Sequence, residues 1–210
     1  MAQYPKNWNP TICIPEVRND LVRYSLTLKN ANNNSGKKLL VLLQNPSKAD
    51  DKISDGTINN VIKYVEKHSN NFNEIVIINI FPVRCGTLNR ASVDICEAIK
   101  NEDYISYNNK IISCYLNKVD HVLLAYGRLE NMKPNDRSHW ITQLTNILEM
   151  IKKCKHLNLY AIYKLNKNGH PKHFAVQSIN QIKDCAPNDL FVKIELDNAN
   201  NISFQKPIHS

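Results

Sequence analysis

Residues 39–47 read LLVLLQNPS, an apolar run that turns abruptly polar. The run from Leu39 to Leu43 is typical of a strand that is covered on both faces, as in a parallel sheet. Because Pro46 has no N–H to donate to a central ladder, we expect the strand to end just before it. Asp55-Gly56-Thr57 then begins a segment with apolar residues at helical spacing. This order predicts a strand, a loop and a helix with Asp55 as its N-cap.

Buried runs and helical patterns continue to alternate along the chain. Further strands are predicted at residues 23–29, 74–80, 119–126, 157–163 and 190–194, and helices at 103–116, 138–151 and 178–183, with a loop and a short helix within 85–102. We therefore expect a single α/β domain over residues 1–210. It would be a three-layer α/β/α arrangement around a central, mostly parallel sheet of about four to five strands. Residues 1–20 are expected to be an irregular lead-in and 196–210 a C-terminal tail.

The composition excludes several classes of protein. No apolar run could span a membrane, and residues 1–9 lack the apolar core of a secretory signal, so we expect a cytoplasmic protein. The 5 glycines form neither a dinucleotide-binding motif nor a P-loop. The 6 cysteines form no CxxC pair, which argues against zinc and iron–sulfur sites. We expect reduced thiols in the core, and neither a metal nor another cofactor.

The formal net charge of +8 and the pI of about 9.1 favour a polyanionic partner. Nucleic acid is the commonest such partner, because lysine and arginine neutralise its phosphates. The basic residues are spread along the sequence, so a dispersed solubilising surface remains the alternative. We expect a monomer with no membrane partner.

Polar residues follow four of the predicted strands, and they are Gln44-Asn45-Pro46, Asn79, Tyr126-Gly127 and Gly169-His170-Pro171. In open α/β sheets, ligands bind outside the carboxyl ends of the strands. Four segments that are distant in sequence would meet at this edge. The sequence therefore predicts a binding site there.

Each of these residues also has a purely structural interpretation. Asn45 could close an Asx turn, Asn79 could tie down a loop, and His170 could be an exposed loop residue. A buried amide can instead read a ligand, since it offers a donor and an acceptor together. Among the nearby acids, Asp55 is expected to cap a helix, whereas Asp50 could orient a water.

Aromatic and basic residues are the remaining candidates for contacts with a nucleic acid. Phe81 and Tyr126, at strand ends, are candidates for stacking on a base. Arg84, Lys172 and His173 are candidates for contacts with phosphate. Trp140 and Tyr107 lie at helical spacing in apolar patterns and are expected in the core.

The series LLQNPSKAD, DGTI, IINIFPVR, LLAYG and NGHPKHF resembles a bacterial and phage family, domain-of-unknown-function family 1643. The resemblance covers residues 20–175, most of the chain. It departs at Gln44, where the family tends to have leucine, and at His173-Phe174, where it tends to have His-Pro. The family label by itself implies no activity.

The order and placement of the motifs are also similar to the uracil-DNA glycosylase superfamily. That resemblance implies a glycosylase fold, with Asn45 positioning a water, Asn79 reading the base edge and His170 stabilising the departing base. Gln44, Pro46, Ser47 and Gly127 would line the pocket. In uracil-specific relatives a bulky tyrosine follows the proline, whereas Ser47 leaves room at C5 of a pyrimidine.

The resulting hypothesis is a DNA glycosylase that flips out a modified base and leaves an abasic site. The base could be a glucosylated hydroxymethylcytosine in phage DNA, which would make the enzyme an antiphage defence. Three alternatives stay open. The first is an enzyme with another substrate, which would excise uracil or a mismatched base or cleave a free nucleoside or nucleotide. The second is a non-catalytic nucleic-acid-binding protein. The third is a small-molecule-binding α/β protein.

Overall fold

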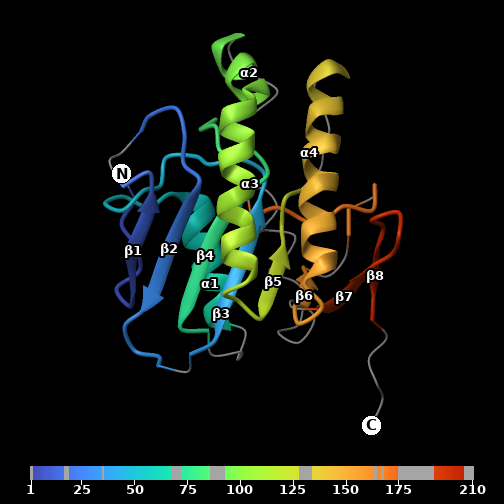
Figure 1. Ribbon diagram of the computed structural model, residues 1–210. Helices are drawn as coiled ribbons and strands as arrows, with labels where there is room; N and C mark the ends of the chain where they lie inside the picture. The colour runs from blue at the N-terminus through green and yellow to red at the C-terminus, as the bar shows by residue number, and fades with distance from the viewer. Residues whose placement is uncertain are drawn as a thin grey trace.

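The structure is a computed structural model, which describes residues 2–16, 19–34, 36–67, 72–85, 93–127, 134–162, 165–166, 168–174 and 192–205. Within these ranges, eight strands form one sheet (Figure 1). The strands are β1 (Trp8–Ile14), β2 (Ser25–Asn30), β3 (Lys38–Leu43), β4 (Glu74–Asn79), β5 (His121–Leu124), β6 (Asn158–Ala161), β7 (Val192–Leu196) and β8 (Ile202–Phe204). The helices in the same ranges are α1 (Gly56–Lys67), α2 (Val93–Lys100), α3 (Glu102–Leu116) and α4 (Pro134–Lys153).

The sheet is mixed, with the strand order β1-β2-β4-β3-β5-β6-β7-β8. Its centre, β4-β3-β5-β6, is parallel, and the strands on both sides of this centre pair antiparallel. The expectation of an α/β protein is confirmed. The expectation of a mostly parallel sheet of four to five strands is wrong, because β1, β2, β7 and β8 pair antiparallel and extend the sheet to eight strands.

The two strands that were not predicted, β1 and β8, lie where irregular ends were expected. β1 falls in the lead-in, and Pro10 is tolerated there because β1 is an edge strand with a register irregularity between Pro10 and Ile12. β8 and the end of β7 fall in the expected tail. β7 overlaps the predicted strand at 190–194, of which residues 190 and 191 lie outside the described residues. The predicted helix at 178–183 lies outside the described residues.

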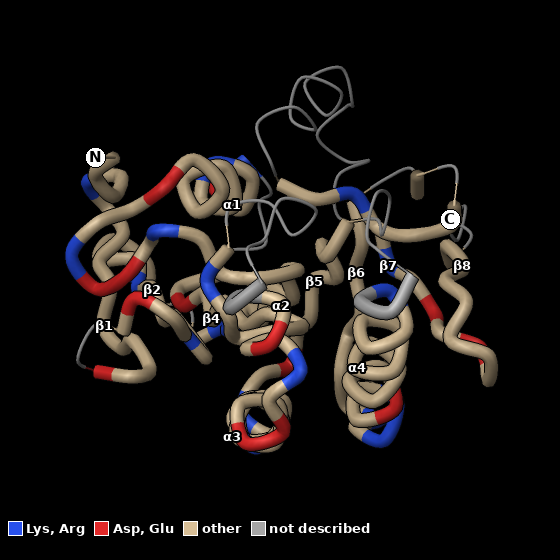
Figure 2. Tube along the Cα trace, turned by 90° about the horizontal axis from the view of Figure 1, so that it is seen from above, with Lys and Arg blue, Asp and Glu red and all other residues tan. Residues whose placement is uncertain are grey.

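The core has two parts, one on each face of the sheet. α1 covers one face and α2, α3 and α4 the other (Figures 1 and 2). In α1 and α4, apolar residues recur at helical spacing and polar residues lie between them. Each helix therefore buries a single apolar stripe against the sheet. Trp140 is fully buried, as predicted, whereas Tyr107 is 46% exposed and its ring packs on that of Tyr24 in a T-shaped arrangement.

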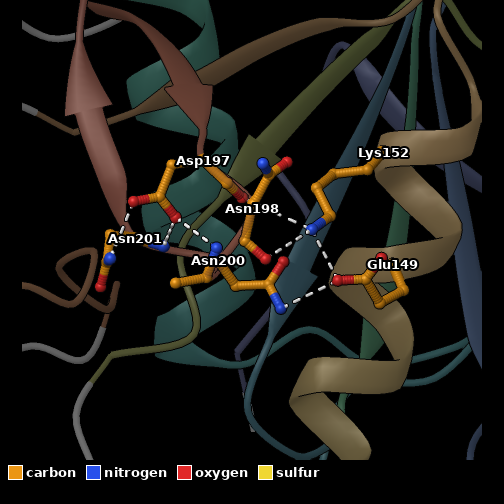
Figure 3. A network of polar contacts seen from close by, with 7 residues as sticks. Glu149, Lys152, Asp197, Asn198, Asn200 and Asn201 are labelled. Carbon is orange, nitrogen blue, oxygen red and sulfur yellow. Dashed lines mark hydrogen bonds and ion pairs between the residues drawn. The ribbon is translucent and has the colours of Figure 1, made fainter.

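The turn between β7 and β8 is attached to the end of α4 by a polar network (Figure 3). Lys152 Nζ lies 2.6 Å from Glu149 Oε1, which also accepts a hydrogen bond from Asn200 Nδ2. The network lies near the amino ends of the parallel strands, since β6 begins shortly after the end of α4. It therefore supports the β7–β8 hairpin and lies at the opposite edge of the sheet from the carboxyl ends of these strands.

Two further expectations concern the thiols and the membrane. Cys13 is buried, but Cys114 is exposed and Cys85, Cys96 and Cys154 are partly exposed, so the prediction that all the cysteines are buried is wrong. No helix within the described ranges has the length and apolar character needed to cross a bilayer.

Candidate functional site

The loops after β3 and β4 are joined beyond the ends of their strands. Ile80 N–H donates to the Leu43 carbonyl at 2.9 Å, Phe81 N–H to the Gln44 carbonyl at 3.1 Å and Cys85 N–H to the Pro46 carbonyl at 2.9 Å. The parallel ladder of β3 and β4 therefore continues into the two loops. Residues that follow these strands are held as one unit at the carboxyl edge.

The Asn45 side chain links the loop after β3 to the loop after β4. Its Nδ2 donates to the carbonyls of Cys85 and Pro46. These two acceptors fix which end of the amide carries the nitrogen. No donor within the described ranges reaches Oδ1, which is left as a hydrogen-bond acceptor on a half-buried side chain.

Asn79 ends β4 with an amide that is completely buried. Neither Nδ2 nor Oδ1 has a hydrogen-bond partner among the residues that the structure describes. The neighbouring backbone is well supported, because Asn108 Nδ2 donates to the carbonyls of Asn79 and Ile80. The Asn79 side chain therefore ties down no loop within the described ranges, and a buried amide without a hydrogen-bond partner costs about 1–3 kcal/mol.

The alternation of β4 shows which face Asn79 occupies. Ile75 and Ile77 belong to the core beneath α1, and Val76 and Ile78 to the core beneath α3 and α4. By the same period of two, the Asn79 side chain lies on the α1 face. Leu43, its partner in the parallel ladder, lies on this face too.

The two histidines after β6 point to different sides of the sheet. His170 packs on the rings of Tyr126 and Trp140, each with a centroid distance of 6.1 Å, so it lies on the side of α4. Burial lowers its pKa, and the charge of Arg137 acts in the same direction. The structure therefore does not bring the His170 ring together with the Asn79 amide, because the chain crosses the edge of the sheet only after His170.

His173 follows that crossing. It packs against Gly127, and the next residue, Phe174, lies in the core beneath α1. The Phe174 carbonyl accepts a hydrogen bond from Asn60 of α1 at 3.1 Å. Burial lowers the pKa of His173 to about 4, so its imidazole is neutral at pH 7. The Asp55 carboxylate, which caps α1, acts on the His173 imidazole in the opposite direction to burial, so His173 lies on the α1 side of the sheet, as Asn79 does.

The loop between β3 and α1 is organised by two carboxylates. Asp55 Oδ1 accepts from Ile58 N–H at 2.9 Å, which confirms Asp55 as the N-cap of α1, and its Oδ2 accepts from Ala49 N–H at 3.1 Å. Asp50 is buried, and its Oδ1 accepts from the N–H groups of Lys52 and Ile53. Asp50 thus closes a turn in the loop that carries Asn45.

The stacking candidates lie beneath the edge and not on it. Phe81 and Tyr126 are 0% and 1% exposed in the α3–α4 core, so neither ring offers a free face in this conformation. Gln44, Ser47 and Lys172 are half-buried, and Pro46 is buried. Gly127 has a φ of 76°, which glycine adopts without strain.

Arg23 is a site residue that the sequence analysis missed. It is 1% exposed, and its Nη1 donates to the Ala49 carbonyl at 2.7 Å. The candidate Arg84 donates through its own Nη1 to the same carbonyl at 3.1 Å and to the Ser47 carbonyl at 2.7 Å. Arg23 stands at the start of an alternating strand pattern, and nothing in that pattern signals a buried cation.

Two hollows lined by described residues lie elsewhere. One, of about 760 Å³, runs along α3, and the other, of about 310 Å³, lies between the end of α4 and the β7–β8 hairpin. Neither is lined by Asn45, Asn79 or either histidine. The base-sized hollow that the hypothesis expects at the carboxyl edge is not one of these two.

Comparison with known proteins gives one match. A family model with the description "Protein of unknown function (DUF1643)" matches residues 23–173. No curated protein and no solved structure matches. The matched segment runs from Arg23 to His173, so it spans the whole candidate site.

Proposed function

We propose that this chain, which belongs to the DUF1643 family, is a DNA glycosylase that hydrolyses the N-glycosidic bond of a flipped-out modified base. The products are the free base and an abasic site. The proposal assigns one role to each of three side chains at the carboxyl edge, namely Asn79, Asn45 and His173.

The observation that carries the proposal is the unpartnered amide of Asn79. A nucleobase edge presents donors and acceptors side by side, and a carboxamide can pair with both at once. The free energy lost by leaving this amide unpaired in the empty protein would be regained when a base binds. Because both amide atoms are buried, the base can reach them only after neighbouring atoms move.

Asn45 supplies the position of the water. Its Oδ1 accepts a hydrogen bond from a water, whose oxygen then forms a bond to C1′ of the sugar as the bond from C1′ to the base breaks. The electron pair of the broken bond leaves with the base as an anion. The proton that the attacking water loses passes to solvent, and the anion takes up a proton from solvent to become the free base. An amide is a weak base, but a sugar with cation-like character requires little more than a well-placed nucleophile. The loop clamp through Nδ2 keeps Oδ1 in a fixed place.

A neutral imidazole stabilises the departing base by donating a hydrogen bond to it as negative charge develops. The superfamily resemblance suggests His170 for this role. The geometry favours His173, since it lies on the α1 side with Asn79 while His170 packs on Trp140. One such donor is typically worth about 2.7–4 kcal/mol in the transition state.

The charge of +8 supports DNA as the partner, because phosphate contacts supply most of the affinity of such proteins. Among the described residues, lysine and arginine positions are distributed over several elements of the trace (Figure 2). In this proposal, Lys172, half-buried next to His173 in sequence, would contact a phosphate near the flipped nucleotide.

Ser47 suggests the class of base. A serine after Pro46 leaves more room than the tyrosine of uracil-specific relatives. A pyrimidine with a large C5 substituent, such as glucosylated hydroxymethylcytosine of phage DNA, would fit that space. The biological role would then be defence against phage.

The test is incubation of the purified protein with duplexes that contain cytosine, uracil, hydroxymethylcytosine or glucosylated hydroxymethylcytosine, with mass spectrometry of released bases. We expect release of the glucosylated base and about a 100-fold loss with Asn79→Ala. The matched control is Asn158→Ala, an amide at the opposite edge of the sheet. Release of uracil alone would support a uracil glycosylase, and DNA binding without release a non-catalytic protein.

A further inference from the structure

The guanidinium group of Arg84 joins two segments that lie far apart in the sequence. Its Nε donates to the Asn19 carbonyl at 2.9 Å, and its Nη1 donates to the carbonyls of Ser47 and Ala49 at 2.7 Å and 3.1 Å. The backbone N–H of Arg84 also donates to the Leu21 carbonyl at 2.7 Å. These four acceptors are all backbone oxygens, so through them Arg84 fixes the course of the main chain.

The peptide groups of Ala49 are held from both sides. The Ala49 carbonyl accepts from Arg84 and, at 2.7 Å, from the buried guanidinium of Arg23, and the Ala49 N–H donates to Asp55 Oδ2 at 3.1 Å. Burial and the charge of Arg84 lower the pKa of Arg23, and the Asp55 carboxylate acts in the opposite direction. Negative charge is therefore present beside the two guanidinium groups, and together these contacts fix the loop at Ala49.

Two adjacent residues, Arg84 and Cys85, hold the start of the loop after β3. Cys85 N–H donates to the Pro46 carbonyl at 2.9 Å, and the Cys85 carbonyl accepts from Asn45 Nδ2. Arg84 holds the next carbonyl, that of Ser47, through its side chain. Asn45 and Pro46 are thus held by the backbone of the loop after β4. A substitution at Arg84 can therefore release Ser47 while Asn45 keeps its place.

We propose that Arg84 is a positioning residue that sets the place of Ser47, and thereby the selectivity of the site for the substituent at C5 of a pyrimidine. The part played by Ser47 rests on the proposed function, in which this residue borders the space next to C5. Small shifts in a binding pocket have large effects, because a misplacement of about 1 Å can change a reaction rate by about 100-fold.

A direct contact with phosphate, which the sequence suggested, is the alternative role for Arg84. Replacing a residue that contacts phosphate weakens the binding of all substrates alike and lowers the log–log dependence of binding on salt by about one unit. Replacing a residue that positions Ser47 changes the ratio between substrates instead, since it acts on one wall of the pocket. Selectivity and salt dependence therefore separate the two roles.

The experiment compares kcat/KM for base release from duplexes that contain glucosylated hydroxymethylcytosine, hydroxymethylcytosine or uracil. The variants are Arg84→Met, which removes the guanidinium bonds, and Arg84→Lys, which keeps the charge without the fork. The matched control is Lys118→Met, which removes an exposed cation just beyond the end of α3. We expect Arg84→Met to lower the ratio between the preferred base and the others by at least about tenfold, and Arg84→Lys to lower it less. Lys118→Met should leave the ratio unchanged.

Amide hydrogen exchange at the Ala49 N–H is a second measurement, and it requires no substrate. This N–H and that of Ile58 both donate to Asp55, at 3.1 Å and 2.9 Å. Loss of the Arg84 guanidinium should speed exchange at Ala49 by at least about tenfold and leave Ile58, in the first turn of α1, close to the wild type. Arg84→Lys serves for this comparison if Arg84→Met does not fold. Unchanged exchange at Ala49 in a folded variant would overturn the proposal, as would an equal loss for all bases with a lower salt dependence.

Two outcomes separate the role of Arg84 from the proposed function. No base release by the wild type, with faster exchange at Ala49 in the Arg84 variants, would contradict the glycosylase and its selectivity but support Arg84 as the residue that holds the loop. Base release with an unchanged ratio in Arg84→Met would contradict the role of Arg84 in selectivity alone.

Discussion

Gly127 and His173 pack so closely that a Cβ atom on Gly127 would lie 2.8 Å from the Cβ of His173. This contact joins the segment after β5 to the segment after β6. The atom that would be met belongs to the root of the His173 side chain and cannot rotate away. The glycine therefore fixes how closely His173 approaches the edge of the sheet.

Gly127→Ala should displace His173 and lower the rate of base release. The left-handed φ of 76° adds a cost of about 1–2 kcal/mol for any residue with a Cβ. The matched control is Gly36→Ala, since Gly36 has a φ of 77° and nothing within 4 Å of its added Cβ. Chemical denaturation and activity assays of both variants separate the two effects. Equal losses of activity in the two variants would contradict a role for the contact.

Asn79→Leu should make the empty protein more stable while abolishing base release. Leucine has a similar size, and it removes two buried polar atoms that have no partner in the described structure. The expected gain is about 1–3 kcal/mol, or several degrees in the melting temperature. The contrasting variant is Asn108→Leu, which loses hydrogen bonds to two carbonyls and should be destabilised. A loss of stability in Asn79→Leu would show that the amide has a partner after all.

The sequence predicted the strands at the centre of the sheet and missed those at its edges. Leu39 to Leu43 form an unbroken apolar run because helices cover both faces of β3, and that burial is visible in the sequence. β1 and β8 are edge strands with exposed positions and a mixed pattern. Their pairing depends on a neighbouring strand, which a local pattern does not contain.

The position of some candidate residues could be predicted, but not the detail of their arrangement. Polar residues at strand ends predicted that Asn45 and Asn79 lie together at the carboxyl edge, and in the structure they follow the paired strands β3 and β4. The choice between His170 and His173 depends on where the segment that contains them crosses the edge of the sheet. The local sequence does not show the place of that crossing. The burial of the Arg23 guanidinium could not be predicted either, because its hydrogen-bond acceptor, the Ala49 carbonyl, lies 26 residues away in the chain.

Asp50→Asn should preserve folding and base release, because an asparagine Oδ1 can accept the same two N–H groups of Lys52 and Ile53. Asp50→Ala should lower the free energy of unfolding by about 1–3 kcal/mol and weaken activity through the loop. Urea denaturation and base-release assays of the pair test this. Loss of activity in a stable Asp50→Asn protein would instead identify the carboxylate as the group that activates water.

His173 should make the protein less stable as the pH falls from about 6.5 towards 4. Burial lowers its pKa from the ordinary 6.5 to about 4, so within this window the unfolded chain binds a proton that the folded chain does not. Stability lost on acidification should amount to about 1–3 kcal/mol, and above pH 6.5 the residue should contribute no pH dependence.

His173→Gln should flatten part of this slope, because glutamine does not titrate. It should also slow base release by about 100- to 1000-fold at pH 7.5, where the wild-type imidazole is already neutral. His170→Gln is the matched control: the pKa of His170 is lowered too, so its variant should also flatten the stability profile, but it should keep most of the activity. Urea midpoints between pH 4.5 and 7.5, measured with rates of base release, test both residues, and greater loss of activity in His170→Gln would return the leaving-group role to His170.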